Sequence, residues 1–342
     1  MGERRPVRVA IVGAGAWGWQ HARVFGAHPD VELCGIAGRS PERTGARARE
    51  FGARAYTDLE GMLADARPDL VSVCLPNEGH FEPTLRVIRA GFPLLVEKPL
   101  VFDLAEADTL LAEAEARGLF FAINFNHRYA RPVRLAAEAI GGGALGRPVF
   151  ATWRFGGEAG TGSHPFANLV ETQCHGFDLL EHLCGPVASV AAEMTDLTGR
   201  GWSTMAIALR FANGAVGSLV GSYDSSYAYP DTQRVEVNGT AGRVLIEDTV
   251  RRYQFSRAGS ERREVWEAGY FNDLDREFHR TFDRHVDELL AAFTQGREPP
   301  VHARAGRRAL ALADAAIRSF RRGARVEVAP DAAPGGPSAL WR

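Results

Sequence analysis

The hydrophobic positions in the first third of the chain form short apolar runs separated by longer amphipathic segments. A run such as VRVAIV at 7–12 is typical of a strand that is buried on both faces of a parallel sheet. Strands that alternate with helices of this length predict a doubly wound parallel sheet. The predicted strands are 7–12, 31–37, 70–75, 94–96 and 120–125, and the predicted helices are 15–27, 80–90 and 104–117.

The pattern changes after residue 125, where several strands follow one another without intervening helices. Asn213-Gly214 is a typical two-residue hairpin turn between two of them. This succession predicts a second, α+β domain with a largely antiparallel or mixed open sheet. Its predicted strands are 148–155, 187–194, 204–211, 215–223, 234–238 and 244–247, and its predicted helices are 133–140, 171–184, 274–295 and 303–321.

The expected organisation is therefore α/β, with a dinucleotide-binding domain at 1–125 and an α+β substrate-binding and oligomerisation domain at 126–328. The Pro/Gly/Ala-rich end, 329–342, is expected to be disordered. The chain has 342 residues, 45% of them hydrophobic and 24% charged, which fits a globular protein of about two domains.

Charge and leader signals exclude several classes of partner. A net charge of -2 and a pI near 6.6 provide no basic field for nucleic acid or for a membrane surface. No apolar run approaches the ~20 residues that span a bilayer. Glycines interrupt the apolar N-terminal run, and Pro6 breaks the myristoylation pattern, so we expect a cytoplasmic protein. The four cysteines form no C-x-x-C pair, which argues against a disulfide framework or a zinc site.

One residue stands out in the composition. Of the 40 basic residues, Lys98 is the only lysine, and all the others are arginines. Arginine cannot lose its proton in a protein, whereas the ammonium of lysine can be tuned by its surroundings. A lysine kept where every other basic position is arginine is a candidate for proton chemistry.

The glycine-rich segment GAGAWG at 13–18 directly follows a predicted strand and opens a predicted helix. In this context Gly13 allows the tight turn, Gly15 lets the backbone approach a pyrophosphate, and Gly18 lets the helix pack closely on the sheet. The amides of Ala16 and Trp17, at the helix N-terminus, would meet the phosphates. The segment predicts a dinucleotide site.

The end of the second strand bears on the choice between NAD and NADP. The position that usually carries a carboxylate for the ribose of NAD is Gly38. Arg39 offers a fork of donors for a 2′-phosphate, Ser40 adds a hydroxyl, and Arg43 lies one turn further on. The sequence favours NADP, with NAD as the alternative cofactor.

Glu97-Lys98-Pro99 ends another predicted strand, at the edge of the sheet where ligands bind in open α/β folds. Pro99 favours an extended conformation of Lys98, which suits a side chain that projects into a cleft. The neighbouring strand ends at the same edge. We therefore add to the expected cofactor-binding residues the ends of both strands, Leu75, Pro76, Asn77, His80, Glu97 and Lys98.

A second polar cluster lies in the segment ETQCHGFD at 171–178. On a continuous helix, Glu171, His175 and Asp178 would share one face. A carboxylate one turn from a histidine can fix its tautomer and raise its basicity. Glu171 and His175 could also share a metal ion, but a third ligand is missing, so no metal is expected.

Residues 13–328 resemble, almost end to end, the Gfo/Idh/MocA family of sugar and cyclitol oxidoreductases. The resemblance implies a Rossmann domain, a nicotinamide cofactor, and a homodimer or homotetramer formed through the open sheet of the second domain. It also implies that Lys98 and His175 flank the reacting carbinol. The sequence departs from the family helix at Glu171, where Asp is usual, and at Gln173, where Gly is usual. The resemblance rests on GAGAWG, PNEGH at 76–80, EKP at 97–99, NHRY at 126–129, ETQCHGFD, and the closing GRRALALADAAIRSFRRG.

The expected reaction is reversible hydride transfer between the nicotinamide and a secondary alcohol of a sugar or cyclitol ring. His175, oriented by Glu171, would take the hydroxyl proton, and Lys98 would stabilise the charge on the same oxygen. The residues expected to bind the rest of the substrate are Asp178, Asn126, Arg128, Tyr129 and Trp153.

Two other functions fit the same motifs. One is a redox glycosidase of this family, which would use tightly held NAD for transient oxidation. The other is a sensor that binds nucleotide and sugar without transforming them. Three further histidines, His21, His127 and His164, have no carboxylate at helical spacing comparable to Glu171 and are interpreted as structural, although His164, in a glycine-rich loop, stays a candidate.

Overall fold

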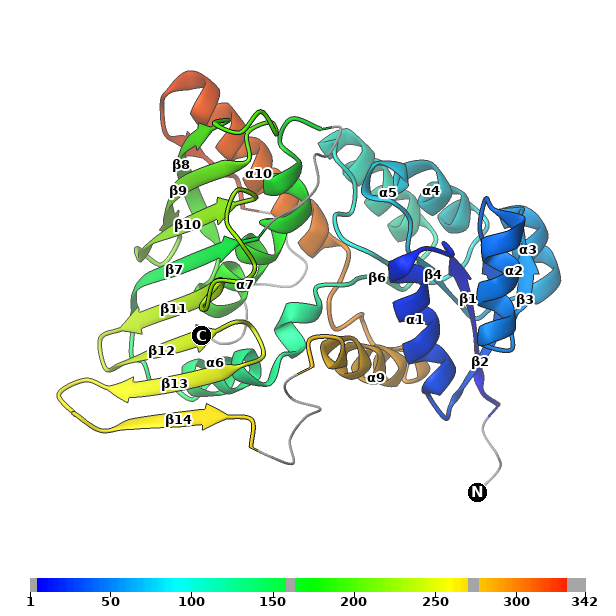
Figure 1. Cartoon of the computed structure of the whole chain (residues 1–342), viewed down its shortest axis with the longest axis horizontal. Coiled ribbons are helices and arrows are strands. Elements are labelled where there is room, and N and C mark those ends of the chain that lie inside the picture. Colours follow the sequence, from blue (N-terminus) through cyan, green and yellow to red (C-terminus); the bar gives the residue numbers. More distant parts are fainter. Residues whose placement is uncertain (1–4, 158–163, 270–276, 331–342) are drawn as a thin grey trace. The chain divides into compact units, whose positions relative to one another are not determined.

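The computed structural model describes residues 5–157, 164–269 and 277–330, and the chain divides into two compact units (Figure 1). The first unit comprises Met1–Phe125 and Phe282–Arg307, and the second comprises Asn126–Thr281 and Arg308–Arg342. From residue 331 onward the predicted tail lies outside the described residues. Within the described ranges, no helix is both long and apolar enough to cross a membrane.

In the described part of the first unit, six parallel strands form one sheet in the order β3-β2-β1-β4-β5-β6. This order confirms the predicted doubly wound sheet. The strand β3 and the two helices that connect it to its neighbours, α2 and α3, were not predicted. The strand is only three residues long and largely exposed. The strands are β1 Val7–Val12, β2 Val31–Ala37, β3 Arg54–Tyr56, β4 Leu70–Val73, β5 Leu94–Val96 and β6 Phe121–Ile123, and the helices are α1 Ala16–Ala27, α2 Pro41–Glu50, α3 Leu59–Ala66, α4 Phe81–Arg89 and α5 Leu104–Ala116.

The central strands of this sheet are apolar on both faces because helices cover both sides. Ile11, Leu70, Leu94 and Phe121 are 0% exposed, one from each of four neighbouring strands. All four cysteines of the chain are buried, and none is in a disulfide. The apolar runs identified in the sequence are thus the buried strands that form the core of this unit.

The segment 282–307, which the sequence analysis assigned to the second domain, belongs to the first unit. It contains most of α9, Arg280–Thr294, and the beginning of α10, Arg304–Arg322. The reason is local pairing at the edge of the sheet. The amide of Ile123 donates to the carbonyl of Val301 (3.0 Å), and the amide of Ala303 donates to that of Phe121 (2.9 Å). This segment therefore covers the edge that β6 would otherwise expose.

In the described part of the second unit, nine strands form one mixed sheet in the order β14-β13-β12-β11-β7-β10-β9-β8-β15. The β7–β10 pair is parallel, and the other neighbouring pairs between described strands are antiparallel. This confirms the predicted mixed sheet, although its last three strands were missed. The strands are β7 Pro148–Gly156, β8 Val187–Thr195, β9 Thr204–Phe211, β10 Val216–Ser222, β11 Gln233–Gly239, β12 Gly242–Glu247, β13 Arg252–Arg257, β14 Arg263–Glu267 and β15 Val326–Glu327.

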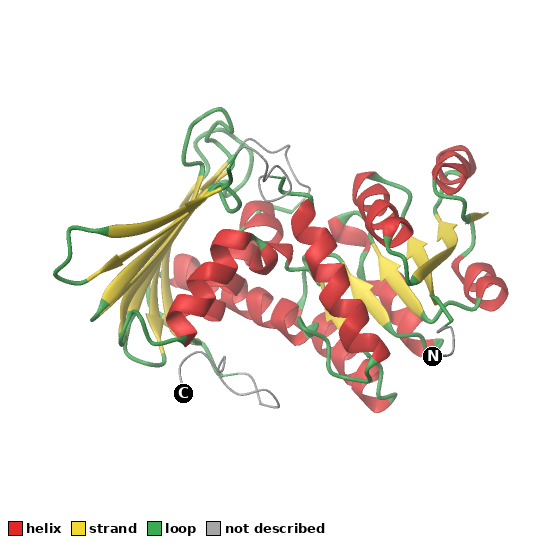
Figure 2. Ribbon diagram, turned by 90° about the horizontal axis from the view of Figure 1, so that it is seen from below, coloured by secondary structure: helices red, strands yellow, loops and turns green. Residues whose placement is uncertain are grey.

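One face of this sheet packs against helices of the same unit, α6 Arg131–Gly141 and α7 Cys174–Cys184 among them (Figure 2). Strand β9 shows the consequence, since its residues alternate between buried and exposed along its length. The predicted turn joins β9 to β10, where the amide of Phe211 donates to the carbonyl of Ala215 (2.9 Å) and Gly214 adopts a φ of +92°. That positive φ explains why glycine stands in the turn.

Candidate functional site

The three glycines of the first loop have three different structural roles. Gly13 has a φ of +123°, and a Cβ there would lie 2.2 Å from the carbonyl oxygen of Cys74. A Cβ on Gly18 would lie 1.9 Å from the carbonyl oxygen of Gly13. Gly15 differs, because a Cβ there would meet nothing within 4 Å, and no side chain caps the helix that starts after it. The open position and the uncapped amides of α1 fit a pyrophosphate.

The end of β2 is shaped to have no side chain at Gly38. A Cβ there would lie 2.5 Å from Oγ1 of Thr44 and 3.1 Å from Cβ of Ala14. The side chains of Arg39 and Arg43 are exposed beside it. Ser40 caps α2, because its Oγ accepts a hydrogen bond from the amide of Arg43 (3.3 Å). The hydroxyl proton of that serine is still available for donation.

Lys98 follows β5, whose neighbour in the sheet is β4, so the EKP and PNEGH segments leave the sheet side by side. His80 links the two segments. Its ring nitrogens lie 2.8 Å from the carbonyl oxygens of Leu75 and Pro99. Burial lowers the pKa of His80, although these two carbonyls oppose the shift. The imidazole is 1% exposed, so it holds the two strand ends from within.

Glu97 lies below the surface rather than on it. The residue is 3% exposed, and its Oε1 accepts a hydrogen bond from Nδ2 of Asn124 (2.6 Å) and lies 2.7 Å from Nε2 of His21. Its place after a strand of the sheet predicts that Glu97 contacts the cofactor. In the structure its carboxylate is engaged with protein groups instead.

In the second unit, the predicted helix 171–184 is not continuous. Asn168–Thr172 forms a π-helix, and α7 begins only at Cys174. Glu171 therefore lies in the π-helical turn that precedes α7 rather than on one continuous α-helix with His175. His175 and Asp178 do lie together on α7, and both are 5% exposed.

The ring beside His175 is His127. The two imidazoles are stacked, with centroids 3.9 Å apart and planes 4° from parallel. His127 belongs to a short 3-10 helix, Asn126–Tyr129, that begins directly after the first unit ends. The sequence analysis interpreted His127 as structural because no carboxylate lay at helical spacing. Its position in the NHRY motif was the available signal.

Two expected substrate-binding residues bind each other. The guanidinium of Arg128 donates through Nε to Oδ2 of Asp178 (2.8 Å) and through Nη2 to the other carboxylate oxygen. Burial raises the pKa of Asp178, and Arg128 opposes that shift. Asn126 is 3% exposed, and its Nδ2 donates to Oγ1 of Thr281 (2.7 Å). Tyr129 is 5% exposed.

Trp153 is 1% exposed, so its ring is packed inside the second unit. Its Nε1 donates to Oε1 of Gln173 (2.8 Å), whose Nε2 donates to Oδ1 of Asn168 (3.0 Å). A Cβ on Gly221 would lie 2.4 Å from the Gln173 side chain. Gln173 thus occupies space that a glycine on β10 leaves open, and this accounts for the larger residue where the family usually has glycine.

Comparison with known proteins assigns both parts of the chain. A model described as the GFO_IDH_MocA oxidoreductase family, NAD-binding Rossmann fold, matches residues 7–125. The model of that family's C-terminal alpha/beta domain matches residues 137–328. The chain belongs to the Gfo/Idh/MocA oxidoreductase family. The predictions of the family, of an oxidoreductase that acts on CH–OH groups and of a dinucleotide-binding Rossmann domain are confirmed, and the family description of that domain is NAD-binding.

Relatives of this Gfo/Idh/MocA protein include dehydrogenases of cyclitols and sugars. The chain is 26% identical to the inositol 2-dehydrogenase of Rhizobium meliloti, over 94% of this chain and 99% of the relative. It is 26% identical to the myo-inositol 2-dehydrogenase of Thermotoga maritima, over 92% and 96%. A structure of levoglucosan dehydrogenase with NADH and levoglucosan shares the fold at a TM-score of 0.87, with 21% identity over 95% and 100% of the two chains.

Proposed function

We propose that this enzyme catalyses reversible oxidation of a secondary alcohol on a sugar or cyclitol ring, with NADP as the preferred cofactor. The observation that carries the proposal is the arrangement at the carboxyl ends of the parallel strands in the first unit. The open Gly15 follows β1, and Lys98 follows β5, with only β4 between these two strands. The dinucleotide loop and Lys98 thus both follow the carboxyl ends of strands in the same parallel sheet, which is where ligands bind in open α/β folds.

The bound nicotinamide would accept or deliver the hydride, and the residues of this chain would manage the proton. Lys98 would donate a hydrogen bond to the reacting oxygen and stabilise its negative charge. His175 would exchange a proton with that same oxygen as the general base. The stacked ring of His127 would support the orientation of this imidazole, in addition to the carboxylate of Glu171.

Support for the ring substrate comes from the relatives, whose names include inositol and glucoside dehydrogenases. The paired Arg128 and Asp178 would contact the ring as one unit. They would use the donors and acceptors that are not engaged in their two mutual hydrogen bonds. Asn126 and Tyr129, which follow the first unit directly, would line the same approach.

Support for NADP comes from the end of β2. Gly38 leaves no carboxylate to repel a 2′-phosphate, and the packing of Thr44 and Ala14 leaves no space for one. Arg39 and Arg43 are exposed and can form charge-assisted hydrogen bonds to a phosphate. Arg39→Ala should raise KM for NADP about tenfold or more and leave KM for NAD nearly unchanged. Arg49→Ala, at the far end of α2, is the control.

The test of the reaction is nicotinamide absorbance during incubation with a panel of cyclitols and sugars, with NADP and NAD offered separately. Turnover that is lost in Lys98→Arg supports the proposal. Release of an aglycone from glycosides without net nicotinamide reduction would replace it with a redox glycosidase. Nucleotide binding without either activity would replace it with a sensor.

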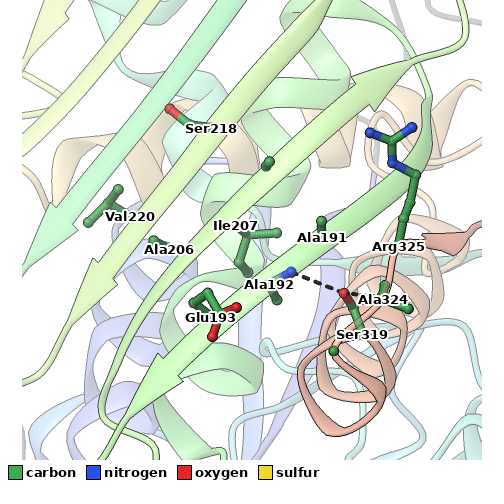
Figure 3. Close-up of a pocket in the computed structure, with 12 residues that line it drawn as sticks. Ala191, Ala192, Glu193, Ala206, Ile207, Ser218, Val220, Ser319, Ala324 and Arg325 are labelled. Atoms are coloured by element: carbon green, nitrogen blue, oxygen red, sulfur yellow. Dashed lines mark hydrogen bonds between the residues drawn. The ribbon is translucent and has the colours of Figure 1, made fainter.

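We further propose that a second copy of the chain covers the face of the nine-stranded sheet on which no described helix packs. This face carries a hollow of about 440 Å³ over β8, β9 and β10. Its floor is formed by short side chains, among them Ala191 and Ala206, while Glu193, Val220 and Arg325 stand around it (Figure 3). An exposed surface with small apolar residues beside charges of both signs suits a self-complementary contact.

Light scattering after gel filtration tests this contact. The wild-type protein should elute as a dimer or tetramer, and Val220→Arg should shift it toward the monomer. Val220 is 39% exposed on this face. Leu197→Arg is the matched control, because Leu197 is 87% exposed outside the sheet strands. A monomeric wild-type protein, or equal effects of the two substitutions, would contradict the proposed interface.

A further inference from the structure

A chain of buried polar groups lies beneath the EKP segment and is not used by the reaction described above. His21, on α1, is 1% exposed. Its Nε2 lies 2.7 Å from Oε1 of Glu97, and its Nδ1 lies 2.8 Å from Oγ of Ser72 on β4. A buried carboxylate is costly unless it is paired, so the contact with His21 is what allows Glu97 to remain in the core.

The other contacts of Glu97 fix its direction. Oε1 also accepts from Nδ2 of Asn124 (2.6 Å), and Oε2 accepts from the backbone amide of Lys98 (3.2 Å). Because the Asn124 amide donates to Glu97, its Oδ1 must accept, and Nδ1 of His285 on α9 lies 2.8 Å from it. Every neighbour of the Glu97 carboxyl named here can serve as a donor, which is the pattern of an ionised carboxylate.

The protonation of the pair agrees with this geometry. Burial alone would lower the pKa of His21, but Cys74 and Glu97 together raise it to about 10. Burial alone would raise the pKa of Glu97, but His21, Lys98 and Asn124 lower it below its ordinary value. Both directions favour an imidazolium that faces a carboxylate.

We infer that His21 is a positioning residue for Lys98, because it neutralises the carboxylate of the preceding residue and anchors the backbone from which the lysine projects. This inference rests on the proposed function only for the role of Lys98 in the reaction. With His21 charged, Glu97 has its counterion inside the core. With His21 uncharged, the carboxylate would draw more strongly on the ammonium of Lys98, which already lowers the pKa of Glu97.

Lys98 can be observed directly, because it is the only lysine in the sequence. Reductive methylation with [13C]formaldehyde would label Lys98 and the α-amino group alone, and NMR would follow each signal with pH. In His21→Gln, which keeps a donor for Glu97 but removes the charge, the titration midpoint of the Lys98 signal should move up by about one pH unit. Unlabelled enzyme should lose about tenfold in kcat, with little change in nucleotide KM.

Two further variants separate positioning from simple damage. His21→Gln combined with Glu97→Gln removes the uncompensated carboxylate and should return the Lys98 midpoint close to the wild-type value. Glu97→Gln alone removes a charge that keeps His21 protonated, so both charges are lost and the midpoint should stay close to the wild-type value. A fall of the midpoint in this variant would mean that His21 is uncharged in the wild type, so the inference stays testable if His21→Gln does not fold. Val24→Ala, in the same helix and 5% exposed, is the control for lost packing and should not move the midpoint.

An unchanged Lys98 midpoint in folded His21→Gln, or equal shifts in that variant and Val24→Ala, would overturn the inference. The NMR measurement requires no turnover. It therefore stands even if no ring substrate is oxidised, and a failure of the proposed reaction is distinguishable from a failure of this inference.

Discussion

The imidazoles of His127 and His175 are stacked 3.9 Å apart with their planes 4° from parallel. The ring of Phe278 meets His127 edge-on, with centroids 5.3 Å apart and an interplanar angle of 89°. His175 is therefore held in orientation by a ring that is itself held from the side. The proposed role of His175 as a general base requires one nitrogen in a fixed direction, and an aromatic neighbour can help to fix that direction.

This stack predicts a small loss of kcat for one substitution of His127 and a large loss for another. His127→Phe keeps a flat ring of similar size and should retain kcat within about threefold, whereas His127→Ala should reduce kcat by about tenfold or more. KM for the nucleotide should change little in either variant. Steady-state kinetics on the sugar panel would measure both. Equal losses in the two variants would mean that the imidazole of His127 acts chemically and not as a planar support.

The Arg128–Asp178 pair predicts a large loss of stability when one partner is removed. The side chains are 21% and 2% exposed, respectively. Asp178→Asn leaves the guanidinium without its countercharge and should lower the free energy of unfolding by about 3 kcal/mol. The double variant Arg128→Met with Asp178→Leu should recover most of that loss, because the charges are removed together. Urea unfolding measures both, and a double variant as unstable as the single one would contradict a purely pairwise role.

His182 predicts a specific acid sensitivity. Burial, followed by the charge of Arg128, lowers the pKa of His182 to about 3. The unfolded chain takes up a proton near pH 6.5 that the folded chain excludes, so stability falls as the pH drops from about 6.5 toward 3. This one group contributes at most about 1.4 kcal/mol per pH unit. His182→Gln should lose less stability than the wild type between pH 7 and 4.5, and parallel losses would refute this assignment.

The glycine-rich loop predicts that two alanine substitutions separate folding from binding. Gly18→Ala places a Cβ 1.9 Å from a backbone oxygen and should lower the midpoint of thermal unfolding markedly. Gly15→Ala meets nothing within 4 Å and should leave that midpoint nearly unchanged. Nucleotide affinity, measured by quenching of tryptophan fluorescence, should fall in Gly15→Ala because the new methyl group obstructs the pyrophosphate. Retained affinity would place the phosphates elsewhere.

Elements whose signal is local could be predicted from the sequence. The apolar runs of β1 and β2 and the GAGAWG loop were readable because a buried parallel strand and a tight turn each require particular residues at adjacent positions. The Asn213-Gly214 turn was readable for the same reason. The three-residue β3 was not, because most of its side chains are exposed and leave no hydrophobic pattern.

The π-helix at Asn168–Thr172 shows where local reasoning fails. The amide of Gln173 donates to the carbonyl of Asn168 (3.0 Å), five residues back rather than four. The side chains of Gln173 and Asn168 are tied to Trp153 and to the backbone of Ser203, both outside this segment. These tertiary contacts set the register of the turn that carries Glu171, and no local sequence pattern could show it.

The sequence by itself determined the chemical inventory and the local framework, namely a strand–glycine loop–helix unit, a single lysine after a strand, and a histidine in the later helix. Only the tertiary structure decided which polar groups are already paired, as Asp178 is with Arg128 and Glu97 with His21. The same holds for the stacking of His127 on His175, 48 residues apart. The physical reason is that burial and pairing depend on segments distant in the chain, whereas turn geometry and strand patterning depend on neighbours.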